Sequence, residues 1–279
     1  MAEKKIIAID ASTLDSWDMC KKKYELQFIK HLTTSYKSKS LSQGQLIHLM
    51  LKNYYTFKKH DANFNFEEVV SQSVLIAYNE SFDLSPVEVE EVINVFRGYC
   101  KKYENENWTI EEVEKPFAVT LYDSEELQII GQGISDLIVT SPSGLAIVDH
   151  KKRSRREEEN SLNNQRYMYT IALGINTFIT NKLVFIKDPD RYMRQIDSYD
   201  QDQQNEWLEE LVMAVKEIIA FKSIGFYRRS STSCDKFGGC QFKKFCNKTP
   251  SRRELMIGRE YFEGEVWDVG KVLEEKNNE

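Results

Sequence analysis

Apolar residues recur at helical spacing in several parts of the chain. The clearest case is the segment from Val89 to Cys100, in which the apolar side chains fall on one face of a helix. Ser85 and Glu88 form a capping box at its start, and Pro86 fits the first turn. This pattern predicts a helix over residues 85–103. Further helices are expected over residues 14–31, 44–57, 158–173 and 201–221.

Apolar and β-branched segments in the middle of the chain predict strands. The expected strands cover residues 112–121, 127–139, 145–151, 182–186 and 191–196. Because helices come first, strands dominate the middle and a long helix follows, one α/β core with helical additions is the simplest fold. We predict a mixed central β-sheet flanked by helices. The expected organisation is an N-terminal helical region (1–110), a core (111–222) and a C-terminal region (223–279).

A turn at Ser141-Pro142-Ser143-Gly144 joins two of the expected strands and predicts their register. Proline followed by glycine, with serines beside them, is typical of a β-turn. If the turn is centred between Pro142 and Ser143, residues whose numbers sum to 285 lie opposite each other. Asp136 then faces Asp149, with side chains about 5 Å apart on one face of the sheet.

Two opposed carboxylates repel each other unless a proton or a divalent cation lies between them. Lys151 lies two residues beyond Asp149 and therefore points to the same sheet face. Asp136, Asp149 and Lys151 beside a metal ion would form a hydrolytic centre. The Asp-x-Lys pattern alone is also common at solvated strand ends, so neighbouring motifs have to decide between the two interpretations.

The composition is that of a globular protein, with 41% apolar residues in a chain of 279. This length can bury one large core, or one core and a smaller lobe. No uninterrupted apolar run exceeds five residues, which is too short to cross a bilayer. The apolar stretch near the N-terminus is too short for a secretory signal. We therefore expect a cytoplasmic protein without a membrane segment.

The net charge of −6 does not by itself indicate nucleic-acid binding, but positive charge is concentrated locally. Residues 228–253 contain eight basic residues and one acidic residue, and residues 21–23 and 151–156 form further basic blocks. Such blocks are usually solvated surfaces. Here they flank the proposed hydrolytic centre, which favours a polyanionic substrate.

Three of the five cysteines, Cys234, Cys240 and Cys246, are closely spaced near the C-terminus. In a cytosolic protein this spacing indicates a metal or cluster site rather than disulfides. Cys20 is the best candidate for a fourth thiolate ligand. The spacing differs from the paired C-x2-C of common zinc modules, which disfavours zinc without excluding it. Cys100 lies on an apolar helix face and is expected to be a core thiol.

Five short motifs together resemble the PD-(D/E)XK nuclease superfamily, in particular its RecB-like branch with an iron–sulfur cluster. They are G-x-x-x-H at 44–48, G-x-x-D at 133–136, D-x-K at 149–151, Q-x-x-x-Y at 165–169 and the one-plus-three cysteine pattern. The last three cysteines of better-known members often begin with C-x2-C, from which this chain departs. The resemblance implies a restriction-endonuclease-like core.

The resemblance also implies metal ligands. Asp136 and Asp149 would bind Mg²⁺ or Mn²⁺, and His48 would be a further ligand, although taken alone it would be an ordinary half-buried histidine. The main-chain carbonyl of His150 can add a ligand, whereas its side chain must point to the opposite sheet face.

The remaining motif residues have roles implied by the same resemblance. Lys151 would orient the attacking water. Gln165 and Tyr169, four residues apart on one helix face, would lie near this lysine and the DNA strand. The thiolates of Cys20 and the C-terminal trio would hold a 4Fe-4S cluster, with zinc as the alternative.

These observations favour a metal-dependent DNA nuclease, with exonuclease action on DNA ends or single strands. Such a protein would serve recombination, repair or replication in a phage or mobile element. A helicase or recombination protein would be a separate partner, because the chain lacks a G-x4-G-K-[ST] phosphate loop. The alternatives are a DNA-end-binding module that does not cleave, and a nuclease directed at RNA or mismatches.

Overall fold

The computed structural model describes residues 4–34, 38–61, 63–80, 82–236 and 239–264, and also 266, 269, 270 and 273. The chain divides into two compact units. Unit 1 consists of Met1–Tyr36, Ala118–Gly133 and Gln201–Glu279, and unit 2 consists of Lys37–Phe117 and Ile134–Asp200. Most of the acidic end of the C-terminal region lies outside the described residues.

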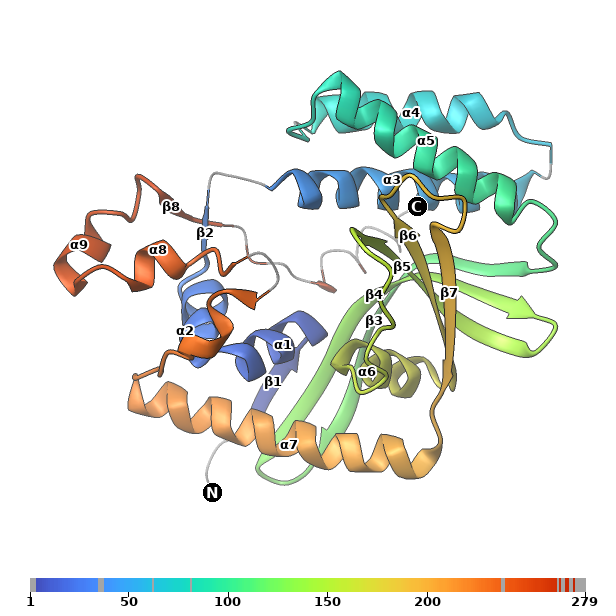
Figure 1. Ribbon diagram of the computed structural model, residues 1–279. Coiled ribbons are helices and arrows are strands. Elements are labelled where there is room, and N and C mark those ends of the chain that lie inside the picture. Colours follow the sequence, from blue (N-terminus) through green and yellow to red (C-terminus); the bar gives the residue numbers. More distant parts are fainter. Residues whose placement is uncertain are drawn as a thin grey trace. The chain divides into compact units, whose positions relative to one another are not determined.

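The strands form a mixed β-sheet, as predicted (Figure 1). The strand order is β1-β4-β5-β6-β7, and β3 also pairs with β4. The β1–β4 and β5–β6 pairs are parallel, whereas β4–β5 and β6–β7 are antiparallel. The bounds are β1 (Lys5–Ile9), β3 (Thr109–Asp123), β4 (Leu127–Ser141), β5 (Gly144–Arg153), β6 (Thr177–Val184) and β7 (Tyr192–Ser198).

The predicted register of the central hairpin is confirmed. Ser141 pairs with Gly144 across the turn, and Leu137 pairs with Val148, so the numbers of paired residues sum to 285. Gly144 adopts a φ of +108°, a backbone conformation that glycine permits and other residues rarely adopt. The turn therefore fixes which residues of β4 and β5 lie opposite each other.

Unit 2 contains the largest hydrophobic core. Helices α3 (Lys39–His60), α4 (Phe66–Asn79) and α5 (Pro86–Lys102) pack together in Figure 1, and α3 also packs on β5. Leu46, Phe96 and Val148 are fully buried in this core. The helix predicted over 85–103 is confirmed as α5, and the Glu88 carboxylate accepts a hydrogen bond from the Ser85 backbone N–H at 2.8 Å. Helix α6 (Asn164–Leu173) contacts β6.

Unit 1 contains short helical segments and one long helix. They are α1 (Ala11–Met19), α2 (Lys21–Tyr24), η1 (Glu25–Ile29), α7 (Gln201–Ile224), η2 (Ser231–Ser233), α8 (Lys243–Cys246) and α9 (Pro250–Glu254). Strands β2 (Leu32–Thr34) and β8 (Tyr261–Glu263) pair antiparallel. A small core formed by Leu26, Phe242, Phe245 and neighbouring apolar residues joins the beginning of the chain to its C-terminal region within this unit.

Three predicted helices have wrong bounds, and polar capping residues explain where they begin. The helix predicted over 44–57 is α3, which begins at Lys39 because the Ser38 side chain accepts a hydrogen bond from the Leu41 N–H. The helix predicted over 14–31 begins earlier, at Ala11, because the Asp10 side chain accepts a hydrogen bond from the Thr13 N–H. It is then interrupted at Cys20, whose backbone is extended. The helix predicted over 158–173 begins only at Asn164, because the Asn163 side chain caps it.

The strand predicted over 182–186 is also wrong in its bounds, since β6 covers Thr177–Val184. Its middle residues Thr180, Asn181 and Lys182 are polar yet almost completely buried, so no apolar pattern marks them. Each has hydrogen-bond partners from other elements. The sequence pattern also missed α4 and β1.

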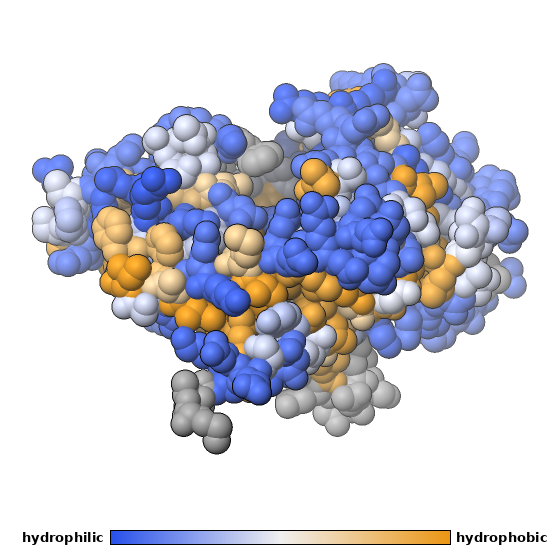
Figure 2. All heavy atoms as spheres, turned by 90° about the horizontal axis from the view of Figure 1, so that it is seen from below, coloured by the Kyte–Doolittle hydropathy of each residue, from blue (hydrophilic) through white to orange (hydrophobic). Residues whose placement is uncertain are grey.

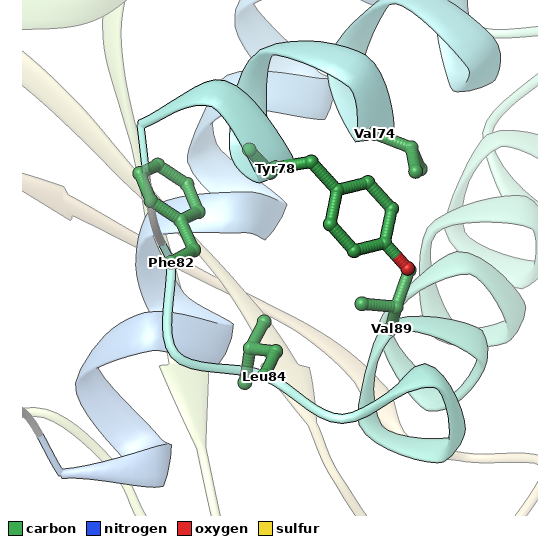
Figure 3. Close-up of a pocket in the computed structure, with 6 residues that line it drawn as sticks. Val74, Tyr78, Phe82, Leu84 and Val89 are labelled. Atoms are coloured by element: carbon green, nitrogen blue, oxygen red, sulfur yellow. The ribbon is translucent and has the colours of Figure 1, made fainter.

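A small apolar pocket lies in unit 2 between α4, the following segment and α5 (Figure 3). Its walls include Val74 and Tyr78 from α4, Phe82 and Leu84 from the connecting segment, and Val89 from α5. No residue proposed for catalysis lines it, so this pocket belongs to the packing of the helices.

On the face of the molecule that Figure 2 shows, apolar side chains gather in a band that hydrophilic side chains border. Helix α7 carries some exposed apolar residues, including Met213 and Ile224. Among the described residues, no helix combines the length and apolar character needed to span a bilayer.

A substitution at Gly98 of α5 tests how closely this helix packs on Tyr192 of β7. A Cβ atom added at Gly98 would lie 2.1 Å from the Tyr192 hydroxyl oxygen, which itself donates a hydrogen bond to the Val95 carbonyl at 2.9 Å. We expect Gly98→Ala to lower the free energy of unfolding by about 1–3 kcal/mol, although alanine favours helices. Denaturant unfolding measures this. Adding Tyr192→Phe removes the clashing oxygen and should recover part of the loss, whereas unchanged stability of the single variant would contradict the packing argument.

Candidate active site and cysteine site

Strand β5 and helix α6 bring three predicted site residues of unit 2 into direct contact. The Lys151 ammonium donates hydrogen bonds to Asp149 Oδ1 at 3.0 Å and to Gln165 Oε1 at 2.9 Å. Gln165 Nε2 donates to the same Asp149 oxygen at 2.9 Å. The three side chains therefore form a closed network in which each fixes the orientation of the other two.

The second carboxylate oxygen of Asp149 is the most informative atom of this site. Asp149 is only 3% exposed, and its Oδ2 atom has no hydrogen-bond partner among the described residues. Leaving a buried acceptor unpaired costs about 1–3 kcal/mol, and more for a charged group. A carboxylate oxygen of this kind is a suitable ligand for a hard divalent cation.

Asp136 of β4 lies next to this network. Its Oδ2 atom accepts a hydrogen bond from the His150 backbone N–H at 2.8 Å and lies 3.4 Å from His48 Nδ1. Burial alone would raise the pKa of Asp136, but nearby His48, His150 and Lys151 outweigh this effect and lower it below the usual value. Asp136 is therefore ionised across the neutral pH range.

Three separate elements thus contribute polar groups to one place in unit 2. His48 comes from α3, Asp136 from β4, and Asp149 and Lys151 from β5. Both Asp136 and Asp149 also act on Tyr169 of α6, because their charges help to raise its pKa. The hairpin register and the family motifs predicted that these residues lie together.

The fit of a metal ion depends on the donors available. In the part of the chain that the structure describes, no three His, Cys, Asp or Glu side chains are arranged to hold a metal ion by themselves. Mg²⁺ usually takes only one or two carboxylates from the protein and completes its shell with water and substrate phosphates. The charged Asp136 and the unpaired oxygen of Asp149 fit this mode of binding.

Tyr169 is largely buried, with 9% of its surface exposed. Its hydroxyl donates a hydrogen bond to the Ile134 carbonyl at 3.0 Å, and its ring packs edge-on against Phe117. Burial, followed by the nearby carboxylates, raises the pKa of Tyr169, so the hydroxyl stays protonated. In this geometry Tyr169 attaches α6 to the strand two residues before Asp136.

The His150 side chain is buried, and its Nδ1 atom lies 3.5 Å from Asp136 Oδ2. Its ring packs against Tyr55 and Tyr99, and its Nε2 atom lies 3.4 Å from both the Tyr99 hydroxyl and Asn181 Nδ2. Asn181 also donates to the Tyr99 hydroxyl at 2.8 Å. The His150 ring therefore connects Asp136 with Tyr99 and Asn181.

Sequence reasoning missed Tyr99 and Asn181 as supports for the site. Asn181 pairs with His150 in the β5–β6 ladder and is completely buried. The available signal was a polar Thr-Asn-Lys run preceding an apolar segment, which reads as a loop unless the partners of those residues are known. The network holds the backbone of His150, and therefore its N–H bond to Asp136, in place.

The four predicted ligand cysteines converge within unit 1. Cys20, Cys234, Cys240 and Cys246 line one pocket, and none forms a disulfide. Cys20 Sγ accepts a hydrogen bond from the Ser230 backbone N–H at 3.3 Å. The interruption between α1 and α2 is what turns this first cysteine toward the C-terminal trio.

The thiols are close enough to affect one another. Burial raises the pKa of Cys240 and Cys246, and the neighbouring cysteines raise it further. Such thiols become ligands when a positive centre stabilises their thiolates. Lys23, Arg229 and Lys243 also line the pocket and would offset negative charge on a thiolate-ligated cluster.

Comparison with known proteins identifies the family. A family model described as "PD-(D/E)XK nuclease superfamily" matches residues 9–247 of the chain. No curated protein matches the chain. Several solved structures resemble the chain. A "putative exonuclease" from Eubacterium rectale has 12% identity and a TM-score of 0.49, with 87% of this chain and 88% of that chain covered.

The second similar structure is SSO0001, with 13% identity, a TM-score of 0.29 and coverage of 60% of this chain and 72% of that chain. Both likenesses are too distant to support an argument about function. The family match does not depend on them, because it extends over most of the chain and includes every residue of the network around Asp149. The chain therefore belongs to the PD-(D/E)XK nuclease superfamily.

Proposed function

We propose that this protein is a metal-dependent deoxyribonuclease that acts as an exonuclease on DNA ends or single strands. The observation that supports this most directly is the buried, unpaired oxygen of Asp149 beside the ionised Asp136. A site that only clamped DNA would have no use for an anionic oxygen that repels phosphate. A bound cation would make the site attract phosphate instead of repelling it.

Asp136 and Asp149 would hold Mg²⁺ or Mn²⁺, with His48 as a further ligand. The ion would supply Lewis-acid stabilisation of negative charge on the scissile phosphate. The protein's own contribution is to hold these oxygens in fixed positions. The His150 backbone N–H keeps Asp136 in place, and Lys151 and Gln165 keep Asp149 in place.

Lys151 is the residue best placed to act on the attacking water. Its ammonium has three N–H donors, and the bonds to Asp149 and Gln165 use two of them. The third can orient the water, and the positive charge offsets the negative charge that develops on the phosphate. Gln165 thereby positions Lys151, and Tyr169 positions α6.

The cysteine site supports assignment to the RecB-like branch. We propose that Cys20, Cys234, Cys240 and Cys246 bind a 4Fe-4S cluster, with zinc as the alternative. Four thiols line one pocket, which is the number of thiolates that such a cluster takes, although they are not arranged around a metal position among the described residues. The cluster would fasten the N-terminal helices to the C-terminal region. A role in phage or mobile-element recombination, repair or replication, with a helicase or recombination protein as partner, completes the proposal.

Removing the lysine tests the catalytic assignment. We expect Lys151→Ala to reduce cleavage of end-labelled DNA by about 10²-fold or more in Mg²⁺ or Mn²⁺. Asp149→Ala should abolish cleavage while DNA binding remains. Lys101→Ala, an exposed change of the same type on α5, is the control and should cleave normally. Unchanged cleavage by both site variants would contradict the proposal, and DNA binding without cleavage by the wild type would favour the end-binding alternative.

The proposed imidazole ligand gives a second test. Because imidazole suits Mn²⁺ better than Mg²⁺, His48→Ala should raise the half-saturating concentration of Mn²⁺ more than that of Mg²⁺. Cleavage rates measured over a titration of each ion provide both values. His60→Ala removes an exposed histidine from the same helix and should change neither. Equal values for His48→Ala and wild type would remove His48 from the ligand set.

The cysteines provide a test that does not depend on activity. The purified protein should be brown, with visible absorbance that bleaches on reduction or chelation. Cys20→Ser should lose this colour and lower the melting temperature, since the cluster links distant segments. Cys100→Ser is the matched control in the core of unit 2 and should keep the colour. Colourless wild-type protein with stoichiometric zinc would overturn the iron–sulfur assignment.

A further inference from the structure

Two glycines lie in the interior of long helices in unit 2, and the structure explains only one of them. Gly98 of α5 has no room for a Cβ atom, because the Tyr192 hydroxyl fills the space. Gly44 of α3 has the opposite surroundings, since an added Cβ would meet nothing within 4 Å. A glycine in a helix interior costs about 1 kcal/mol relative to alanine. No packing contact of the described residues accounts for this cost at Gly44.

The position of Gly44 relates it to the active site. His48 lies one turn further along α3 and on the same face, and Ser40 lies one turn earlier on that face. His48 Nδ1 is 3.4 Å from Asp136 Oδ2. At the other end, Ser40 Oγ accepts a hydrogen bond from Lys152 Nζ at 2.9 Å. The three residues therefore line a path about 12 Å long from the catalytic carboxylate to a lysine.

We infer that this face of α3, formed by Ser40, Gly44 and His48, is the track along which the sugar–phosphate backbone of the substrate strand leaves the catalytic centre. Gly44 keeps the track clear of side chains, so that the strand can approach the helix backbone closely. This inference rests on the proposed nuclease function and specifies where the substrate strand lies.

The chemistry of the track suits a nucleic-acid backbone rather than its bases. Lys152, on which the charges of Glu91 and Lys39 also act, supplies a positive charge for a phosphate further along the strand than the scissile one, and the Ser40 hydroxyl supplies a polar contact. Contacts of this kind carry no sequence information. The track is one helix face wide, and it therefore fits a single strand and predicts cleavage without sequence preference.

Substitutions at Gly44 separate fold stability from substrate binding. Gly44→Ala and Gly44→Leu place good helix formers in open space, so both proteins should fold, and Gly44→Ala should raise the melting temperature by about 2–8 °C. Binding of a fluorescent oligothymidylate, measured by anisotropy in EDTA, should weaken, by about 10-fold for Gly44→Leu. The KM for single-stranded DNA should rise more than kcat falls.

One further variant is a control, and another is a second test of the track. Gly98→Ala should lower the melting temperature and leave the affinity of the folded protein for the oligonucleotide unchanged. Lys152→Ala should make binding less dependent on salt, by about one released counterion.

The outcomes distinguish this inference from the proposed function. If wild-type protein cleaves DNA but Gly44→Leu binds and cleaves equally well, the track is wrong and the nuclease assignment stands. If wild-type protein does not cleave, the binding measurement in EDTA still decides: weaker binding by Gly44→Leu supports the track, and equal binding overturns it.

Discussion

The register of the β4–β5 hairpin is the constraint on which the rest of the site depends. Side chains alternate between the two faces of a strand, so a shift of one residue would turn every side chain of β5 to the other face. Asp149 and Lys151 would then point away from Gln165, and His150 would lose its place between Tyr55 and Tyr99. The two-residue turn before Gly144 prevents this shift, because Ser141 pairs with Gly144 and the pairing continues to Leu137 and Val148.

Successive side chains of β5 have different surroundings. One face presents Asp149 and Lys151 to Gln165, where polar atoms remain available for an ion and for water. His150 is buried against aromatic rings and Asn181, and its Nδ1 atom lies 3.5 Å from Asp136 Oδ2, so this network reaches the candidate site directly. Buried polar networks of this kind hold a single geometry because each unmade hydrogen bond is costly. The buried network around His150 therefore supports the strand that carries Asp149 and Lys151.

In unit 1 the cysteine pocket connects distant segments of the chain. This unit buries large apolar residues such as Trp17, Leu211 and Tyr227, but its C-terminal region consists of short helices that would be marginal alone. Bringing Cys20 to the pocket of the other three cysteines connects segments that are far apart in sequence. A ligand bound there would stabilise these short segments, because its binding free energy adds to the free energy of folding.

The sequence by itself determined the features that depend on neighbouring residues. Helix α5 follows from its apolar spacing and capping box, and the register that pairs Leu137 with Val148 follows from the turn. Tertiary structure decided what depends on distant partners. The chain breaks at Cys20 although the residues around it favour a helix. Strand β6 buries Thr180, Asn181 and Lys182 because other elements supply their hydrogen bonds. Periodicity reports which side of an element is apolar, whereas the burial of a polar group depends on a partner that no local pattern contains.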